Sequence, residues 1–208
     1  MIKKYDLVNI DIKEVARYLG YGKTEPDKNT LDITNELIEK LDLRCRVCYL
    51  KMPVTVDEDL VNFGGFSAKS KDFAKFIGKN EEVFLFGATI GIEFDRLLKK
   101  EMVLSTARAT VLQAIGTCAI ESVCDMFCAE FSLSKRFSAG YGDLAIETQQ
   151  DIFKALSLEK NIGITLTESL LMTPTKSVTA FAVADSCGKA KGCDACDKDC
   201  IYRKAEDK

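Results

Sequence analysis

The sequence of 208 residues contains no histidine. This absence excludes Ser-His and Cys-His nucleophilic catalysis and every histidine-ligated metal site. Glu, Asp, Lys, Tyr or Cys side chains could still carry out acid–base chemistry. A surplus of basic residues is missing as well, because 29 Lys and Arg face 32 Asp and Glu, which gives a net charge of -3. The charge therefore does not favour nucleic-acid binding.

Long apolar runs are also missing. No segment approaches the roughly 18 apolar residues that a membrane-spanning helix needs, and the first 20 residues lack the apolar core of a signal peptide. We therefore expect a cytoplasmic protein that binds neither membranes nor nucleic acid. With 47% hydrophobic residues, the chain suits one domain, or one domain with a small appendage.

Hydrophobic periodicity predicts several helices along the chain. They span residues 9–20, 30–41, 68–78, 105–130 and 147–160, and another follows Gly91. Asp11 is expected to cap the first helix and Gly20 to end it. In the longest helix, one stripe is expected to face the core: Val111, Ile115, Cys118, Ser122, Val123 and Met126. Glu121 and Asp125 lie one turn apart on its flank, where their spacing alone favours a solvent-exposed edge.

The predicted strands lie near residues 45–56, 82–86, 162–168 and 177–184. Between the second strand and the next helix, residues 87–91 (GATIG) form a glycine turn. This turn lacks the GxGxxG pattern of nucleotide-binding loops, so we interpret it as a tight strand–helix corner. Strands and helices do not alternate regularly enough for a doubly wound sheet. The expected fold is α+β, with an antiparallel or mixed twisted sheet flanked by helices.

Nine cysteines are present. Cys45 and Cys48 are three residues apart in a predicted strand, so their side chains should point to opposite faces and play structural roles. The other three cysteines of the predicted core lie in the longest helix, where we expect them to pack: Cys118, Cys124 and Cys128.

The end of the sequence has a different character, which predicts a core over residues 1–185 and a cysteine-rich appendage over 186–208. The appendage is polar and contains four closely spaced cysteines, Cys187, Cys193, Cys196 and Cys200. Four thiolates without histidine suit an iron-sulfur cluster or a tetrahedral zinc site. We favour the cluster slightly. A loose tail with incidental thiols is the alternative.

The segment 136-RFSAGYGD-143 is too rich in glycine for a helix interior and lacks the alternation of a strand. It is followed by Glu-x-Gln and then by IGITLTESLLMTPTKSVTA, and it is preceded by EVARYLGYG and GATIG. This ordered set, spread over residues 9–184, resembles the activation domain of cobalamin-dependent methionine synthase, in a free-standing form. The resemblance implies the methionine synthase activation domain-like fold and an S-adenosylmethionine site.

The resemblance assigns five residues to that site. Arg136 would hold the ligand's carboxylate with its forked donors, and Gly140 would let the backbone approach closely. Ser138 would use main-chain groups, and Tyr141 would offer a ring face and a hydroxyl. Glu121 matches the glutamate that the family places on a helix before the loop. Without the resemblance, a surface ion pair, a turn and a packed ring would explain Arg136, Gly140 and Tyr141.

The implied function is to bind S-adenosylmethionine during the reductive remethylation of the cobalamin of a methionine synthase. The cobalamin must be carried by a partner, since the chain has no corrinoid signature and no histidine for an axial ligand. A flavodoxin-like or ferredoxin-like donor would supply the electron. Two alternatives stay open: reactivation of another corrinoid methyltransferase through an iron-sulfur tail, and a non-catalytic docking module that responds to S-adenosylmethionine. Residues 179–182 lack the Trp-Tyr-Phe pattern of the fused family members.

Overall fold

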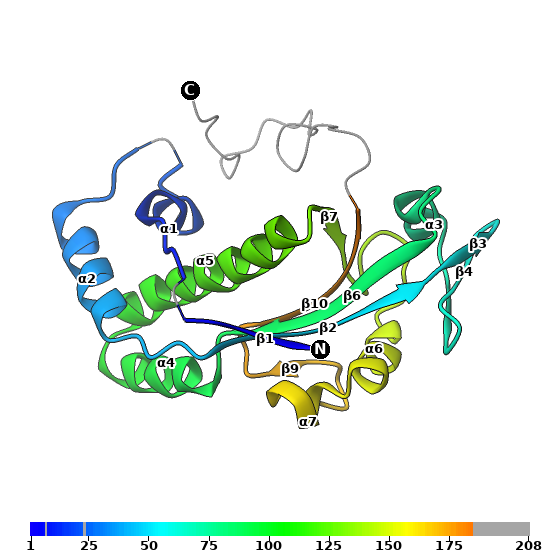
Figure 1. Cartoon of the computed structure of the whole chain (residues 1–208). Helices are drawn as coiled ribbons and strands as arrows, with labels where there is room; N and C mark the ends of the chain where they lie inside the picture. Colours follow the sequence, from blue (N-terminus) through cyan, green and yellow to red (C-terminus); the bar gives the residue numbers. More distant parts are fainter. Residues whose placement is uncertain (7, 23, 185–208) are drawn as a thin grey trace.

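The computed structural model describes residues 1–6, 8–22 and 24–184. Its centre is a five-stranded antiparallel sheet with helices on both faces, which confirms the predicted fold class (Figure 1). In spatial order the strands are β1 (Ile2–Tyr5), β2 (Cys45–Pro53), β6 (Glu82–Thr89), β10 (Ser177–Ala184) and β7 (Leu133–Phe137).

The other elements surround this sheet. The helices are α1 (Ile12–Tyr18), α2 (Lys28–Glu39), α3 (Lys71–Ile77), α4 (Ile92–Leu104), α5 (Thr106–Glu130), α6 (Thr148–Leu156) and α7 (Leu158–Ile162). Two small antiparallel sheets complete the described part of the chain: β3 (Thr55–Asp57) with β4 (Leu60–Asn62) and β5 (Ser67–Lys69), and β8 (Thr165–Leu166) with β9 (Met172–Thr173).

Alternate side chains of the central sheet face two separate hydrophobic clusters, as the two-residue period of a strand requires. Phe86 and Ala182 pack into the cluster formed with α1, α2, α4 and α5. Phe181, the neighbour of Ala182, packs into the opposite cluster with α3, α6 and α7. Figure 1 shows α5 crossing one face of the sheet while α6 and α7 lie on the other. Cys45 and Cys48 enter different clusters, which confirms that they face opposite sides of the sheet.

The long helix α5 lies within one residue of its predicted bounds. The Ser105 side chain caps it by accepting a hydrogen bond from the Arg108 amide at 3.4 Å. Four members of the predicted stripe are buried, but Met126 is 36% exposed, so that assignment was wrong. Phe127, rather than Met126, turns into the aromatic cluster beside Tyr49 and Phe86.

By length and composition alone, α5 could also cross a membrane, which the sequence analysis did not anticipate. However, 67% of its most apolar window is buried inside the protein, as in a core helix. The helix packs closely against α4 at Gly116, where the Phe94 ring of α4 occupies the space of a side chain. A Cβ added to Gly116 would lie only 2.2 Å from Cζ of Phe94.

The structure corrects several predicted boundaries. Strand β6 continues through Gly87, where a Cβ would lie 2.6 Å from Cδ2 of Leu158, so this glycine makes room for packing rather than for a turn. The helix predicted over 147–160 divides at Ser157, which has a φ of +46°. The strand predicted over 162–168 is reduced to β8 because Ile162 still belongs to α7.

Candidate functional site

The site predicted from the sequence begins on β7, an edge strand with β10 as its partner in the sheet. Arg136 pairs with Ala182 and Phe137 with Phe181, and a register shift follows toward Ala184. Arg136 therefore lies in a strand and not in the irregular loop that the sequence predicted. The short LSKRF strand has no apolar alternation of its own and forms through this pairing with β10.

The Arg136 guanidinium is held by two carboxylates of α5. Its Nη2 donates to Oε2 of Glu121 at 2.5 Å, and its Nη1 donates to Oδ1 of Asp125 at 2.8 Å. Burial would lower the pKa of Arg136, but the neighbouring Cys124, Glu121 and Asp125 raise it above its ordinary value. Arg136 thus stays charged, and its position is fixed relative to α5.

Glu121 does not extend freely into solvent, because its side chain is only 41% exposed and is directed at Arg136. Tyr18 of α1 lies near enough to Glu121 for an electrostatic effect. Burial raises the pKa of the Tyr18 hydroxyl, and the Glu121 carboxylate adds to that rise. The structure therefore brings together two of the predicted site residues, Glu121 and Arg136, and adds Asp125 and Tyr18 to their surroundings.

The segment after β7 folds into a tight turn, and two glycines make this possible. Gly140 has a φ of +85° and donates to the Leu144 carbonyl at 2.9 Å. Gly142 has a φ of +54°, and a Cβ there would lie 2.4 Å from Oδ2 of Asp72. Residues with side chains adopt this left-handed backbone at a cost, so glycine suits both positions.

Asp143 attaches the turn to α3, a contact that the sequence analysis missed. Its carboxylate accepts hydrogen bonds from the Ser70 hydroxyl and from the amides of Lys71 at 2.9 Å and Asp72 at 3.1 Å. These bonds lower the pKa of Asp143, and the bond from Ser70 has the largest effect. Ser70 and Asp143 are 73 residues apart, so no local pattern could have indicated the contact.

Ser138 is attached to the central sheet. Its hydroxyl donates to the carbonyl of Thr179 at 2.8 Å. The Thr179 hydroxyl in turn bonds to Oε1 of Gln149 on α6 at 2.9 Å, and both Thr179 and Gln149 are buried. The Glu-x-Gln element seen in the sequence therefore joins α6 to the strand next to β7.

Tyr141 is 60% exposed. Its ring packs edge-on against Phe137 with 6.2 Å between centroids, and Phe137 continues into the aromatic cluster of Phe73 and Phe76. Since Phe137 and Arg136 are successive strand residues, they point to opposite faces. Phe137 thus places Tyr141 beside the sheet edge, and the structure records no contact of Tyr141 with Arg136 among the described residues.

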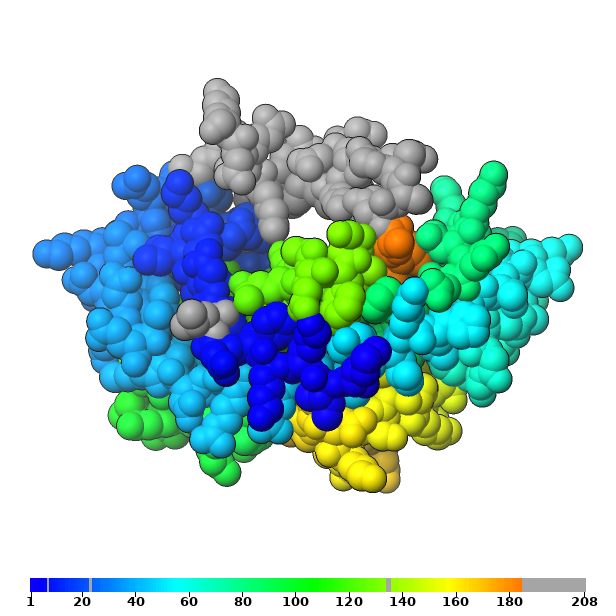
Figure 2. Space-filling view, in the orientation of Figure 1, coloured from blue at the N-terminus to red at the C-terminus, as the bar shows by residue number. Residues whose placement is uncertain are grey.

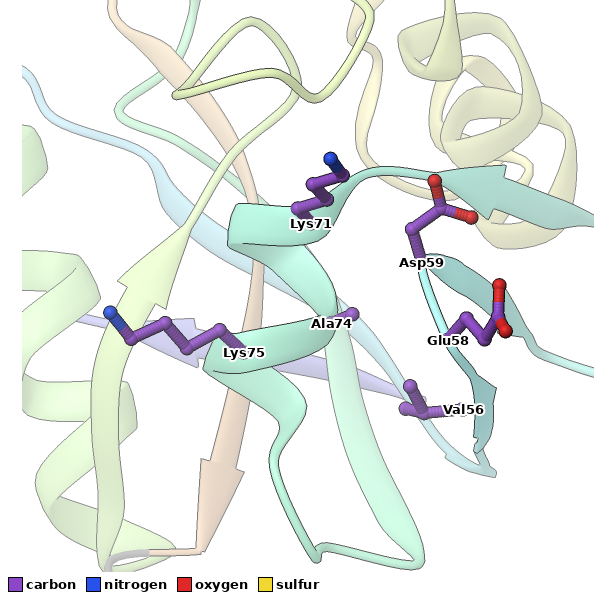
Figure 3. A pocket seen from close by; sticks show the side chains of 6 residues that line it. All are labelled: Val56, Glu58, Asp59, Lys71, Ala74 and Lys75. Carbon is purple, nitrogen blue, oxygen red and sulfur yellow. The ribbon is translucent and has the colours of Figure 1, made fainter.

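Two hollows on the described surface lie elsewhere. The larger, of about 420 Å³, lies between α3 and the β3–β4 hairpin (Figure 3). In Figure 3, Lys71 lies at the end of α3 beside Asp59 of the hairpin, whereas Lys75 points away from the hairpin. The smaller, of about 280 Å³, lies between α4 and the segment that follows α2. Neither of these two hollows includes Arg136 or Glu121.

In the space-filling view, yellow-green residues of α5 and β7 are at the surface beside the orange end of β10 (Figure 2). Arg136 and Glu121 fit a zwitterion chemically, since one offers forked donors to a carboxylate and the other a negative charge to a cation.

The described cysteines are all buried and form no disulfide: Cys45, Cys48, Cys118, Cys124 and Cys128. Burial raises the pKa of the Cys45 thiol to about 11, which suits a packing role. No group of three or more His, Cys, Asp or Glu side chains that could hold a metal occurs in the described ranges. The predicted metal ligands Cys187, Cys193, Cys196 and Cys200 lie outside the described residues.

Comparison with known proteins shows which family this chain resembles. Residues 120–207 match the family model described as "Vitamin B12 dependent methionine synthase, activation domain". The resemblance to the methionine synthase activation domain is confirmed. The matched range contains Glu121, Arg136, Ser138, Gly140 and Tyr141.

A solved structure extends the likeness to the fold of nearly the whole chain. The crystal structure of the MetH reactivation domain bound to AdoHcy has a TM-score of 0.62 with this chain at 15% sequence identity. The match covers 92% of this chain and 80% of that one. At this identity the comparison shows the fold of the activation domain and nothing more. No curated protein matches the chain in sequence.

Proposed function

We propose that this chain binds S-adenosylmethionine and presents it to the cobalamin of a methionine synthase that has lost activity by oxidation. The observation that carries the proposal is the Arg136–Glu121 ion pair, which lies within the range matched by the activation-domain family. The related reactivation domain is described with AdoHcy, the demethylated form of the same ligand. The free-standing role of this chain is part of the proposal.

The proposed reaction has two balanced steps. One electron from a flavodoxin-like or ferredoxin-like donor reduces cob(II)alamin to cob(I)alamin. The electron pair of cob(I)alamin then forms a bond to the methyl carbon of S-adenosylmethionine, while the carbon–sulfur bond breaks and sulfur keeps its pair. The products are methylcobalamin and S-adenosylhomocysteine, and the methyl transfer draws the unfavourable reduction forward.

The chain contributes binding and orientation to this reaction. Arg136 would hold the ligand's carboxylate and Glu121 its ammonium or sulfonium. Tyr141, attached through Phe137, would cover the ligand from the sheet edge. The cobalamin would come on a methionine synthase or another corrinoid protein, because the chain has no histidine to ligate cobalt.

Calorimetry tests the ligand assignment directly. We expect the purified chain to bind S-adenosylmethionine and Arg136→Ala to bind at least about tenfold more weakly, because a charge-assisted contact contributes on the order of 1.5–3 kcal/mol. Arg96→Ala is the matched control, since Arg96 is 69% exposed and pairs only one turn away with Glu93 on α4. Affinity that is equal in wild type and Arg136→Ala would rule out Arg136 as the carboxylate ligand.

A further inference from the structure

Asp125 is a second acid on the Arg136 guanidinium that neither the resemblance nor the comparisons assign to the site. Asp125 and Glu121 lie on successive turns of α5, and each takes a different terminal nitrogen of Arg136. Bidentate capture of a ligand carboxylate needs two neighbouring nitrogens of one guanidinium. A ligand carboxylate that binds across Nη1 and Nη2 therefore competes with these two acids for the guanidinium.

The exposures of the two acids indicate which one gives way. The Asp125 side chain is 62% exposed and that of Glu121 is 41% exposed. Exposed ion pairs contribute little because water screens them and solvates the released acid. Releasing Asp125 thus costs less than releasing Glu121.

The charges of the site also distinguish between possible ligands. Arg136, Glu121 and Asp125 together carry one net negative charge. S-adenosylmethionine carries one net positive charge, because its sulfonium and ammonium outweigh its carboxylate. S-adenosylhomocysteine has a neutral thioether and is a zwitterion with no net charge. A carboxylate near the sulfur therefore attracts the methylated ligand more strongly than the demethylated one.

We propose that Asp125 is a specificity-determining residue of the ligand site. It holds Arg136 while the site is empty, gives way to the ligand's carboxylate, and then favours the sulfonium of S-adenosylmethionine over the thioether of S-adenosylhomocysteine. The proposal rests on the proposed function. Asp125 and Glu121 then have opposite effects on ligand affinity. Glu121 strengthens binding by attracting the ligand's cationic groups, whereas Asp125 weakens it by competing with the ligand's carboxylate for Arg136.

Calorimetry with both ligands at low salt tests this role. In Asp125→Asn we expect tighter binding of S-adenosylhomocysteine, by about twofold or more, because the competitor for Arg136 is weakened. Binding of S-adenosylmethionine gains less, since the attraction for the sulfonium is lost. The preference for S-adenosylmethionine should therefore fall by more than about 1.5-fold. Asp125→Ala should change the preference in the same direction.

The control is Asp151→Asn, which neutralises an exposed helical aspartate paired with Lys154 and should leave the preference unchanged. A preference within a factor of about 1.5 of the wild-type value in both Asp125 variants would overturn the role of Asp125. If S-adenosylmethionine still binds and binding still depends on Arg136, the proposed function remains in place. A wild-type chain that binds neither ligand would overturn both proposals.

Discussion

At the scale of single residues, the candidate site depends on polar side chains that join segments distant in the sequence. Arg136 ties β7 to α5, Ser138 ties the following turn to β10, and Asp143 ties the same turn to α3. Each contact uses a side chain that is fully or partly accessible to solvent. The turn that carries Tyr141 is therefore attached through Ser138 and Asp143, next to a strand that Arg136 ties to α5, and backbone hydrogen bonds such as that from Gly140 to Leu144 close it.

The contact of Asp143 with α3 leads to a prediction about local stability. Asp143→Ala removes the acceptor for the amides of Lys71 and Asp72. We expect faster hydrogen exchange at these two amides and weaker binding of S-adenosylmethionine, because the turn loses its anchor. Hydrogen-exchange mass spectrometry measures the first effect and calorimetry the second. Asp32→Ala, at an exposed position of α2, is the control.

The same contact should respond to pH in a defined direction. The pKa of Asp143 is lowered in the folded chain from 3.8, so the bonds to α3 are complete above about pH 3.8 and are lost as the pH falls through the lowered value. Protection of the Lys71 and Asp72 amides that is unchanged in Asp143→Ala would show that Asp143 does not anchor the turn.

At the scale of secondary-structure elements, Arg108 joins three helices on the face of the sheet that α5 covers. It donates to Glu101 of α4 at 2.6 Å and to both carboxylate oxygens of Glu36 on α2, at 2.9 and 3.0 Å. Bidentate geometry makes this pair more specific than an isolated surface contact. The arrangement holds α2 and α4 against the first turn of α5.

This junction predicts a pH dependence of stability. Hydrogen bonds from Arg108 and Lys40 lower the pKa of Glu36 from 4.5 to about 2 in the folded chain. Its contribution is therefore complete above pH 4.5 and is lost as the pH falls toward 2. We expect the melting temperature of the wild type to decline in this range and that of Glu36→Gln to decline less. Parallel curves for the two proteins would contradict a stabilising role of the pair.

The elements differ in how far the sequence could predict them. Helices α1, α2, α3 and α5 were predictable because periodicity and caps such as Asp11 and Ser105 are local features. Strands β1 and β7 were not, because they are short and depend on partners far away in the chain. For the same reason the sequence indicated Arg136 and Glu121 only through a family resemblance. Their ion pair, the role of Asp125 on it and the Asp143 anchor required the structure.

At the scale of the whole molecule, the candidate site lies at the edge of the central sheet, where β7 meets α5. A site at a sheet edge suits the proposed sharing of the ligand with a second protein that carries the reacting cobalamin. The aromatic cluster of Phe73, Phe76 and Phe137 supports the side of the site next to Tyr141. The helix α5 and its acids support the other side.

The cysteine-rich segment gives a prediction for the full chain. We expect Cys187, Cys193, Cys196 and Cys200 to bind an iron-sulfur cluster, because closely spaced thiolates can enclose one at small entropic cost and a cluster could relay the electron that the proposed reaction needs. Anaerobic purification followed by iron, sulfide and zinc analysis measures this. Replacing the four cysteines by serine should remove the metal, while Cys45→Ala should retain it. Zinc, or no metal, in the wild type would contradict the electron relay.

The central claim is that this chain supplies S-adenosylmethionine for remethylation of a partner's cobalamin. The most direct measurement uses methyl-labelled S-adenosylmethionine, a reductant and a cobalamin-loaded methionine synthase module that lacks its own activation domain, starting from cob(II)alamin. We predict that label appears as methylcobalamin together with an equal amount of S-adenosylhomocysteine, and that Arg136→Ala transfers much less label. Label transfer no greater than in the absence of the chain, under conditions where the chain binds S-adenosylmethionine, would contradict the claim.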